Sequence, residues 1–304
     1  MSILVVGTVA FDSVKTPFGE VERALGGSAT YFSTSSSYFH QTNLVAVVGK
    51  DFRENDRAVF EESGIDTRGL ETMEGETFHW KGEYGYDLNE AKTLATHLNV
   101  LEKFVPRIPE CYRNPDILFL ANVDPDIQRK VVEQVNKPKL TACDTMNFWI
   151  DVKRDSLKET IALVDLLVIN EAEIRQLSEE VNLVKAAKLV ASWGPKIIIV
   201  KQGEYGAILF YENEIFVAPA YPLEAIYDPT GAGDSFAGGL IGHLARVKKI
   251  NKTTLRQAII MGSVMASFNV ESFSLNSLRS LDHHKIAQRF HEFKDLTHFE
   301  LIEA

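Results

Sequence analysis

A run of small residues, Asp228-Pro229-Thr230-Gly231-Ala232-Gly233-Asp234, stands directly before an apolar stretch that predicts a helix as far as Val247. The free N–H groups and the positive dipole end of a helix start favour an anion. Small residues at 231–233 let that anion reach the backbone. A carboxylate at Asp234, beside a bound phosphoryl group, is suited to take a proton from an attacking hydroxyl. The combination is typical of a phosphotransferase.

An ordinary helix N-terminus is the alternative interpretation, because Asp and Gly are common there. Two other kinds of glycine loop do not fit the spacing. A dinucleotide-binding loop needs a third glycine where Phe236 stands. A P-loop needs Gly-x-x-x-x-Gly-Lys, which this sequence does not contain.

Further polar residues and glycines follow predicted strands, at the sheet edge where open α/β folds bind their ligands. Asp12 comes after the first strand and is suited to accept hydrogen bonds from two hydroxyls. The pair Gly26-Gly27 opens a helix and would let a polyol approach the backbone. Asn170 and Glu173 begin another helix and are candidates to lie near a phosphate-bound Mg²⁺, through water. The segment Lys201-Gln202-Gly203-Glu204-Tyr205-Gly206 offers two glycines against which a nucleotide could lie.

The elements that must position these residues are short apolar strands with helical patterns between them. Continuous apolar runs are typical of parallel strands that helices cover on both faces. The predicted strands are Ile3–Val6, Leu44–Val48, Ile117–Leu120, Leu140–Cys143, Leu166–Ile169 and Ile197–Val200, and helices include Pro125–Val135, Glu171–Ser178 and Val184–Trp193. The alternation predicts a layered α/β fold with a mostly parallel sheet. A hairpin turning at Glu212-Asn213 and three helices, Ala232–Val247, Thr253–Asn269 and Ser277–Phe293, complete the chain.

Two segments do not fit this rhythm. Val14–Leu25 contains a turn at Pro17-Phe18-Gly19, and Glu76–Tyr86 alternates in the manner of a strand. We expect residues of about 12–25 and 75–100 to form a small β lid on a single domain that spans residues 1–304. Such a lid would exclude water during phosphoryl transfer. A surface hairpin with exposed aromatic side chains is the alternative.

The composition is that of an ordinary globular protein, with 304 residues, 45% hydrophobic and 24% charged. A net charge of -10 argues against nucleic acid as a partner. The two cysteines, Cys111 and Cys143, are expected to be reduced thiols. The first residues do not resemble a signal peptide, and no apolar run has the length of a membrane span. We therefore expect a cytoplasmic protein without a membrane partner.

With these residues in view, the chain resembles the ribokinase or PfkB family of carbohydrate and nucleoside kinases. The run from Asp228 through Gly239 is similar to the C-terminal signature of that family, and Gly26-Gly27 to its N-terminal glycine pair. The motif Asn170-x-x-Glu173 is similar to its metal and phosphate motif. Lys201-x-Gly203-x-x-Gly206 is similar to its nucleotide-side loop. The order and spacing agree along essentially the whole chain.

The resemblance implies ATP-dependent phosphorylation of a primary hydroxyl. Asp234 would be the general base, and the N–H groups of Gly231, Ala232 and Gly233 would form the anion hole. Mg²⁺ would bridge the ATP phosphates near Asn170 and Glu173. Asp228 and Thr230 stand where members of the family often bind a monovalent cation such as K⁺. Related kinases form homodimers through their lids. From the helix dipole we also expect Asp234 to be held ionised.

The substrate-side residues depart from the family pattern. Sugar kinases of the family usually carry Asn shortly after the glycine pair, whereas this chain has Thr30 and Tyr31, and no Asn before Asn43. Aromatic residues that could cover a sugar or stack on a base are Phe11, Tyr31, Phe78, Trp80 and Tyr84, although they could equally pack the lid against the domain. The first interpretation is a sugar kinase with Asp12, Gly26, Gly27 and Tyr31 at the substrate. The alternatives are an adenosine-type nucleoside kinase and a catalytically silent regulatory binder.

Two further groups of residues have chemistry-bearing side chains. Asp144-Thr145-Met146-Asn147 follows a strand at the ligand edge, so it either contacts substrate or phosphate or forms a capped turn. His283, His284 and His291 fall among charged residues near the end of the chain, which indicates a solvated helix face and not a metal site.

Overall fold

The structure, a computed structural model, describes residues 1–300. Its main sheet has nine strands in the order β13-β12-β11-β10-β9-β8-β1-β4-β5. Seven of the strands run parallel, and only β12 and β13 pair antiparallel at one edge. The strands are β1 (Ile3–Val6), β4 (Thr42–Val48), β5 (Asp66–Thr72), β8 (Ile117–Leu120), β9 (Leu140–Asp144), β10 (Leu166–Asn170), β11 (Ile197–Lys201), β12 (Ala207–Tyr211) and β13 (Glu214–Ala218). The predicted layered α/β fold is confirmed.

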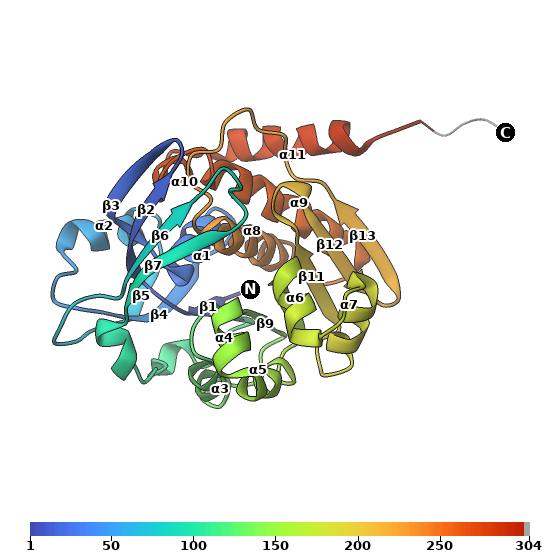
Figure 1. The fold of residues 1–304 in the computed structure, drawn as a ribbon. Coiled ribbons are helices and arrows are strands. Elements are labelled where there is room, and N and C mark those ends of the chain that lie inside the picture. Colours follow the sequence, from blue (N-terminus) through green and yellow to red (C-terminus); the bar gives the residue numbers. More distant parts are fainter. Residues whose placement is uncertain (301–304) are drawn as a thin grey trace.

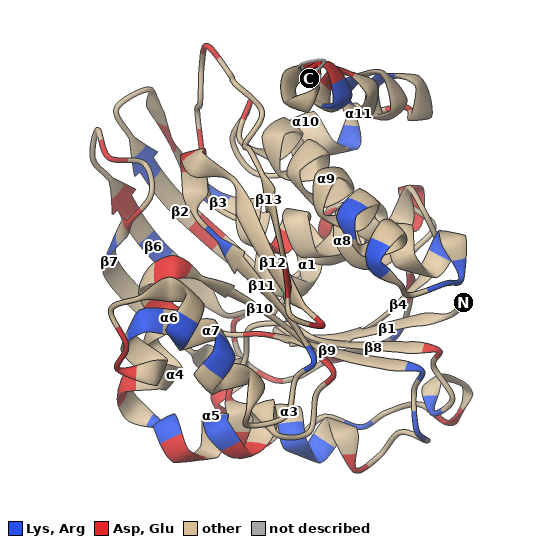
Figure 2. Ribbon diagram, turned by 90° about the vertical axis from the view of Figure 1, so that its right-hand side faces the viewer, with Lys and Arg blue, Asp and Glu red and all other residues tan. Residues whose placement is uncertain are grey.

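Helices cover both faces of this sheet, as Figures 1 and 2 show. On one face lie α1 (Ser28–Ser37), α8 (Ala232–Val247) and α9 (Lys252–Asn269). On the other lie α3 (Pro125–Val132), α4 (Asn147–Val152), α5 (Arg154–Ile161), α6 (Glu171–Ser178) and α7 (Leu183–Ala191). Alternate residues of β1 enter separate cores: Ile3 and Val5 pack with α8, whereas Leu4 and Val6 pack on the α5 side. Strands buried on both faces explain the continuous apolar runs in the sequence.

A second sheet of four strands, in the order β3-β2-β6-β7, stands beside the main one. Its strands are β2 (Ala10–Thr16), β3 (Gly19–Gly26), β6 (His79–Tyr84) and β7 (Ala91–His97). The central pair β2–β6 is parallel, and the outer pairs are antiparallel. The two segments that break the βα rhythm therefore do form one small sheet, which we call the lid sheet.

The remaining elements show where the sequence patterns were insufficient. The helix expected at 277–293 is two helices, α10 (Asn276–Arg279) and α11 (His283–Thr297), because the Asp282 side chain accepts a hydrogen bond from the Lys285 N–H and begins α11. Strand β5, helix α2 (Glu54–Glu62) and the 3₁₀ helices at Asn99–Lys103, Glu110–Tyr112 and Gly203–Tyr205 were not predicted. Within residues 1–300, no helix is both long and apolar enough to cross a membrane.

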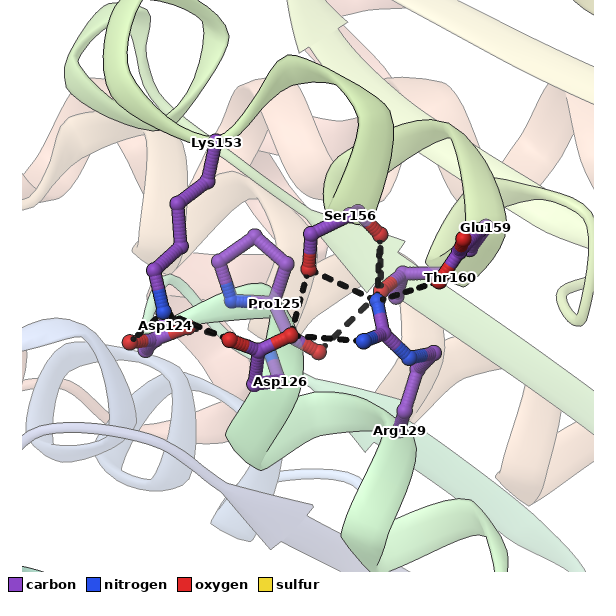
Figure 3. Close-up of polar contacts among 8 residues, drawn as sticks. All are labelled: Asp124, Pro125, Asp126, Arg129, Lys153, Ser156, Glu159 and Thr160. Atoms are coloured by element: carbon purple, nitrogen blue, oxygen red, sulfur yellow. Dashed lines mark hydrogen bonds and ion pairs between the residues drawn. The ribbon is translucent and has the colours of Figure 1, made fainter.

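Figure 2 marks Lys and Arg along α3, α5, α6 and α7, and Asp or Glu along α3, α5 and α6. One cluster joins α3 to the start of α5 (Figure 3). Lys153 Nζ lies 2.7 Å from Asp124 and 2.6 Å from Asp126, and Arg129 Nη1 donates to Ser156 at 2.7 Å. This network fixes the helices that follow β8 and β9, and so supports the edge of the sheet where those strands end.

Candidate active site

The loop before α8 is held in a left-handed turn. Gly231 has φ +75°, and a Cβ at this position would lie 2.3 Å from the ring of Tyr31. Asn269, at the end of α9, donates from its side chain to the carbonyl of Thr230 at 2.8 Å. Its Oδ1 accepts from the Ser235 hydroxyl at 3.1 Å. Only glycine fits at position 231, and α9 fixes the loop from behind.

Asp234 lies in the first turn of α8, with its carboxylate in a desolvated environment. Burial raises its pKa to about 7; the negative charge of Asp144 adds to this shift, and the positive charge of Lys201 opposes it. We expected the helix dipole to hold Asp234 ionised; burial instead raises the pKa of this carboxyl group to about 7. A carboxyl group with a pKa near 7 is suited to proton transfer at neutral pH.

Asp12 approaches from the lid sheet. A Cβ at Gly26 would lie 1.9 Å from Asp12 Oδ2, so the glycine is required for the carboxylate to occupy this place. Burial raises the pKa of Asp12 to about 7, the N–H of Gly27 opposes the shift, and the charges of Asp228 and Asp234 increase it. Asp12 therefore lies near Asp228 and Asp234, which come from a distant part of the chain.

Asp228 is buried beneath the loop. Its carboxylate accepts hydrogen bonds from the N–H groups of Thr230, at 2.9 Å, and of Ser274, at 3.2 Å. Burial raises its pKa, and these hydrogen bonds oppose the shift. The Asp228 side chain therefore closes the turn. That Asp228 and Thr230 bind a monovalent cation stays a prediction.

The neighbouring strands β9, β10 and β11 bring Asp144, Asn170 and Lys201 to one edge of the main sheet. Asn170 is paired with Lys201 in the β10–β11 register, and Asp144 with Val168 of β10. Lys201 Nζ donates to Asp144 Oδ2 at 2.9 Å, with 18% and 4% of the two side chains exposed. This ion pair was not among the alternatives considered for Asp144 from the sequence, which were contact with substrate or phosphate and a capped turn.

Asn170 and Glu173 form the N-terminal cap of α6. Asn170 Oδ1 accepts from the Glu173 N–H at 2.7 Å, and Glu173 Oε2 accepts from the Asn170 N–H at 3.0 Å. Burial raises the pKa of Glu173 to about 7 against the opposing charge of Lys201. No cluster of three or more His, Cys, Asp or Glu within residues 1–300 could hold a metal ion. The oxygens of Asn170 and Glu173 fit a Mg²⁺ that takes most of its ligands from phosphates and water.

The loop after β11 turns through Gly203 (φ +57°) and Gly206 (φ +101°). A Cβ at Gly203 would lie 2.0 Å from Asn89 Oδ1, which belongs to the turn between β6 and β7. The tip of the lid sheet therefore reaches the loop that was predicted to face the nucleotide.

Four of the five predicted aromatic residues divide into two groups. Phe11 packs against Phe52 with the ring centroids 5.8 Å apart in a tilted arrangement, and the ring of Trp80 lies close over Gly82, so these two pack the structure. Tyr31 and Tyr84 are at the site: the Thr230 hydroxyl donates to the Tyr84 hydroxyl at 3.4 Å, and burial together with nearby carboxylates raises the pKa of both phenols. Asn269 and Ser274 also serve the site. They were missed because they follow no recognisable motif.

Comparison with known proteins agrees with this arrangement. The model of the pfkB family carbohydrate kinases matches residues 2–281. A cytidine kinase of Thermococcus kodakarensis is 27% identical over 259 residues, which cover 83% of this chain and 91% of that protein.

Solved structures show the same fold. The nucleoside kinase of Methanocaldococcus jannaschii superposes with a TM-score of 0.75 at 20% identity, over 96% of this chain and 98% of that one. The aminoimidazole riboside kinase of Salmonella enterica, solved with aminoimidazole riboside and an ATP analogue, gives 0.75 at 17% identity, over 95% and 100%. Because the family model spans nearly the whole chain, and the site has its predicted glycine loop and carboxylates, this protein belongs to the pfkB family of carbohydrate kinases and is a phosphotransferase that acts on a hydroxyl group.

Proposed function

We propose that the protein is an ATP-dependent nucleoside kinase that phosphorylates the primary hydroxyl of the ribose. The observation that supports phosphoryl transfer is the position of Asp234 next to the Gly231–Gly233 turn. A general base would there stand beside an anion hole. The similarity to a cytidine kinase over most of both chains supports a nucleoside over the free sugar that the sequence first suggested. The half-buried phenol of Tyr84 beside the loop agrees with a substrate that carries a planar ring.

The acceptor hydroxyl would lie between Asp12 and Asp234. Its oxygen attacks the γ-phosphorus of ATP, its proton passes to Asp234, and the bond from that phosphorus to the bridging oxygen breaks to release ADP. The backbone N–H groups of Gly231, Ala232 and Gly233 stabilise the charge on the transferred group. Gly26 and Gly27 leave room for the ribose, and Asp12 accepts hydrogen bonds from its hydroxyls.

The nucleotide would lie along the Gly203–Gly206 loop. Asn170 and Glu173 would hold Mg²⁺ through water, and the ion, when bound, would neutralise charge on the ATP phosphates. Asp228 and Thr230 would support a monovalent cation such as K⁺, which a comparison of rates in potassium and in tetramethylammonium salts would test.

The lid sheet would cover the substrate and exclude water, since Tyr84 and Asn89 already reach the two sides of the site. Strand β7 is the outer strand of this sheet and is exposed over most of its length, so it would also suit a homodimer through the lids. Light scattering of the purified protein would measure the dimer independently of activity.

The test is ADP release with ATP, Mg²⁺ and K⁺ across cytidine, adenosine, inosine, ribose, fructose and hexose phosphates. Turnover on nucleosides, with kcat/KM at least tenfold above every free sugar, is the expected result. Turnover confined to free sugars or sugar phosphates would replace the nucleoside with the sugar substrate. No turnover on any acceptor would favour a regulatory binder.

A further inference from the structure

The ammonium group of Lys201 lies directly against the start of α8. A Cβ built at Gly233 would be 2.8 Å from Lys201 Nζ, so only a glycine lets the ammonium come this close to the backbone. The lysine is the last residue of β11. Its charge acts on both Asp234 and Glu173.

This placement is unfavourable without a ligand. The N-terminus of α8 carries free N–H groups and the positive end of the helix dipole, which repel a neighbouring cation. Two positive groups that face one another across a glycine are stabilised together when an anion lies between them. A phosphoryl group in contact with the N–H groups of residues 231–233 would be within reach of Lys201 Nζ.

Asp144 explains how the lysine is kept in place. Its nearly buried carboxylate accepts one of the three hydrogen-bond donors of the Lys201 ammonium at 2.9 Å, and two donors remain for a ligand. Burial alone would lower the pKa of Lys201, but the charges of Asp144, Glu173 and Asp234 outweigh burial, and the pKa lies above its ordinary value. Asp144 therefore holds the ammonium in position, and the nearby carboxylates favour its protonated form.

We propose that Lys201 is a catalytic residue that contacts the γ-phosphoryl group during transfer, and that Asp144 is the positioning residue that aims it. The proposal rests on the proposed kinase function. In the transfer, the bond from the acceptor oxygen to phosphorus forms, the bond to the bridging oxygen of ADP breaks, and the proton goes to Asp234. Lys201 keeps its own protons and compensates the negative charge that moves between the oxygens.

The decisive readout is nucleotide affinity, because Lys201 would contact the γ-phosphoryl group, which ADP lacks. In Lys201→Met, we expect the affinity for AMP-PNP to fall at least tenfold by calorimetry, with the affinity for ADP changed less than threefold and kcat lowered about 10²-fold or more. Lys196→Met is the matched control, since this exposed lysine lies at the opposite end of the β11 segment. It should behave as the wild type in all three measurements.

Lys201→Met leaves the buried Asp144 without a partner, so the variant is at risk of misfolding. The double variant Asp144→Asn/Lys201→Met removes both charges and should recover the melting temperature while kcat and the preference for AMP-PNP stay low. Asp144→Asn alone keeps the ammonium but loses the ion pair that aims it, so it should lose part of that preference and less than Lys201→Met does. Wild-type kcat and nucleotide preference in the folded double variant would overturn the proposal.

Failure of the underlying kinase function would look different. A wild-type protein that binds neither AMP-PNP nor ADP would contradict the kinase itself. If the wild type binds both nucleotides but phosphorylates an acceptor other than a nucleoside, only the proposed substrate is wrong. The nucleotide affinities of Lys201→Met then still test the role of Lys201.

Discussion

The hydroxyl of Tyr84, on lid strand β6, lies 3.4 Å from the Thr230 hydroxyl in the loop that begins α8. Residues almost 150 positions apart in the chain thus join the lid sheet to the anion-binding turn. The lid sheet therefore contacts the loop that begins α8.

Replacement of Tyr84 by Phe removes the hydroxyl and keeps the ring. Because one hydrogen bond contributes about 0.5–1.5 kcal/mol, kcat/KM for the acceptor should fall by about tenfold or less, with the larger part in KM. Tyr86→Phe is the control, because Tyr86 is 93% exposed near the tip of the same sheet. Equal effects of the two substitutions would show that the Tyr84–Thr230 contact has no part in substrate binding.

Replacement of Gly231 by Ala combines backbone strain with a collision. A side chain is disfavoured at φ +75°, and the added methyl group would meet the Tyr31 ring at 2.3 Å. We expect a lower melting temperature and loss of nearly all activity. Gly64→Ala separates the two causes, since Gly64 has φ +65° with no atom within 4 Å of its Cβ position. That variant should lose only about 1 kcal/mol of stability and keep its activity, and an equal loss in both would remove Tyr31 from the explanation.

The carboxyl group of Asp234 should make activity and stability respond to pH in opposite directions. Its folded-state pKa is raised from 3.8 to about 7, so the folded protein binds the proton more tightly than the unfolded chain. The contribution to stability is complete below about pH 4 and is lost as the pH rises through 7. The base itself is active only when deprotonated, so kcat/KM should fall as the pH drops below about 7.

It follows that Asp234→Asn, which cannot ionise, should raise the melting temperature at pH 8 and have a smaller effect at pH 4. Scanning calorimetry at the two pH values measures the difference. A variant that melts below the wild type at pH 8 would mean that the carboxylate stabilises the fold.

Much of this arrangement could be predicted from the sequence, because apolar strands and glycine turns are determined by residues that are close together in the chain. The loop at Gly231 and the cap formed by Asn170 and Glu173 depend on nearest neighbours and were correctly located. The pairing of Asp144 with Lys201 depends on which strands are adjacent, and the pKa of Asp234 depends on burial by distant segments. Asn269 supports the loop through α9, and no local pattern identifies such a contact.

The cluster of Figure 3 predicts an acid-sensitive connection between α3 and α5. Hydrogen bonds from Lys153 and Ser156 lower the pKa of Asp126 to about 2. The stabilisation is therefore present above about pH 4 and is lost as the pH falls towards 2. Lys153→Met should reduce the free energy of unfolding in urea at pH 7 and make little difference at pH 2. Lys130→Met, an exposed position on α3, is the control, and a reduction of equal size at both pH values would contradict the role of the cluster.

The central claim, that Asp234 is the base at an anion-binding turn, is tested most directly by comparing ADP formation and ATP binding in the wild type and in Asp234→Asn. With the best nucleoside acceptor at pH 8, we predict that kcat falls 10²- to 10⁴-fold and that the dissociation constant for ATP changes less than threefold. Parallel losses of turnover and ATP affinity, in a variant that remains folded, would contradict the assignment and place Asp234 in nucleotide binding.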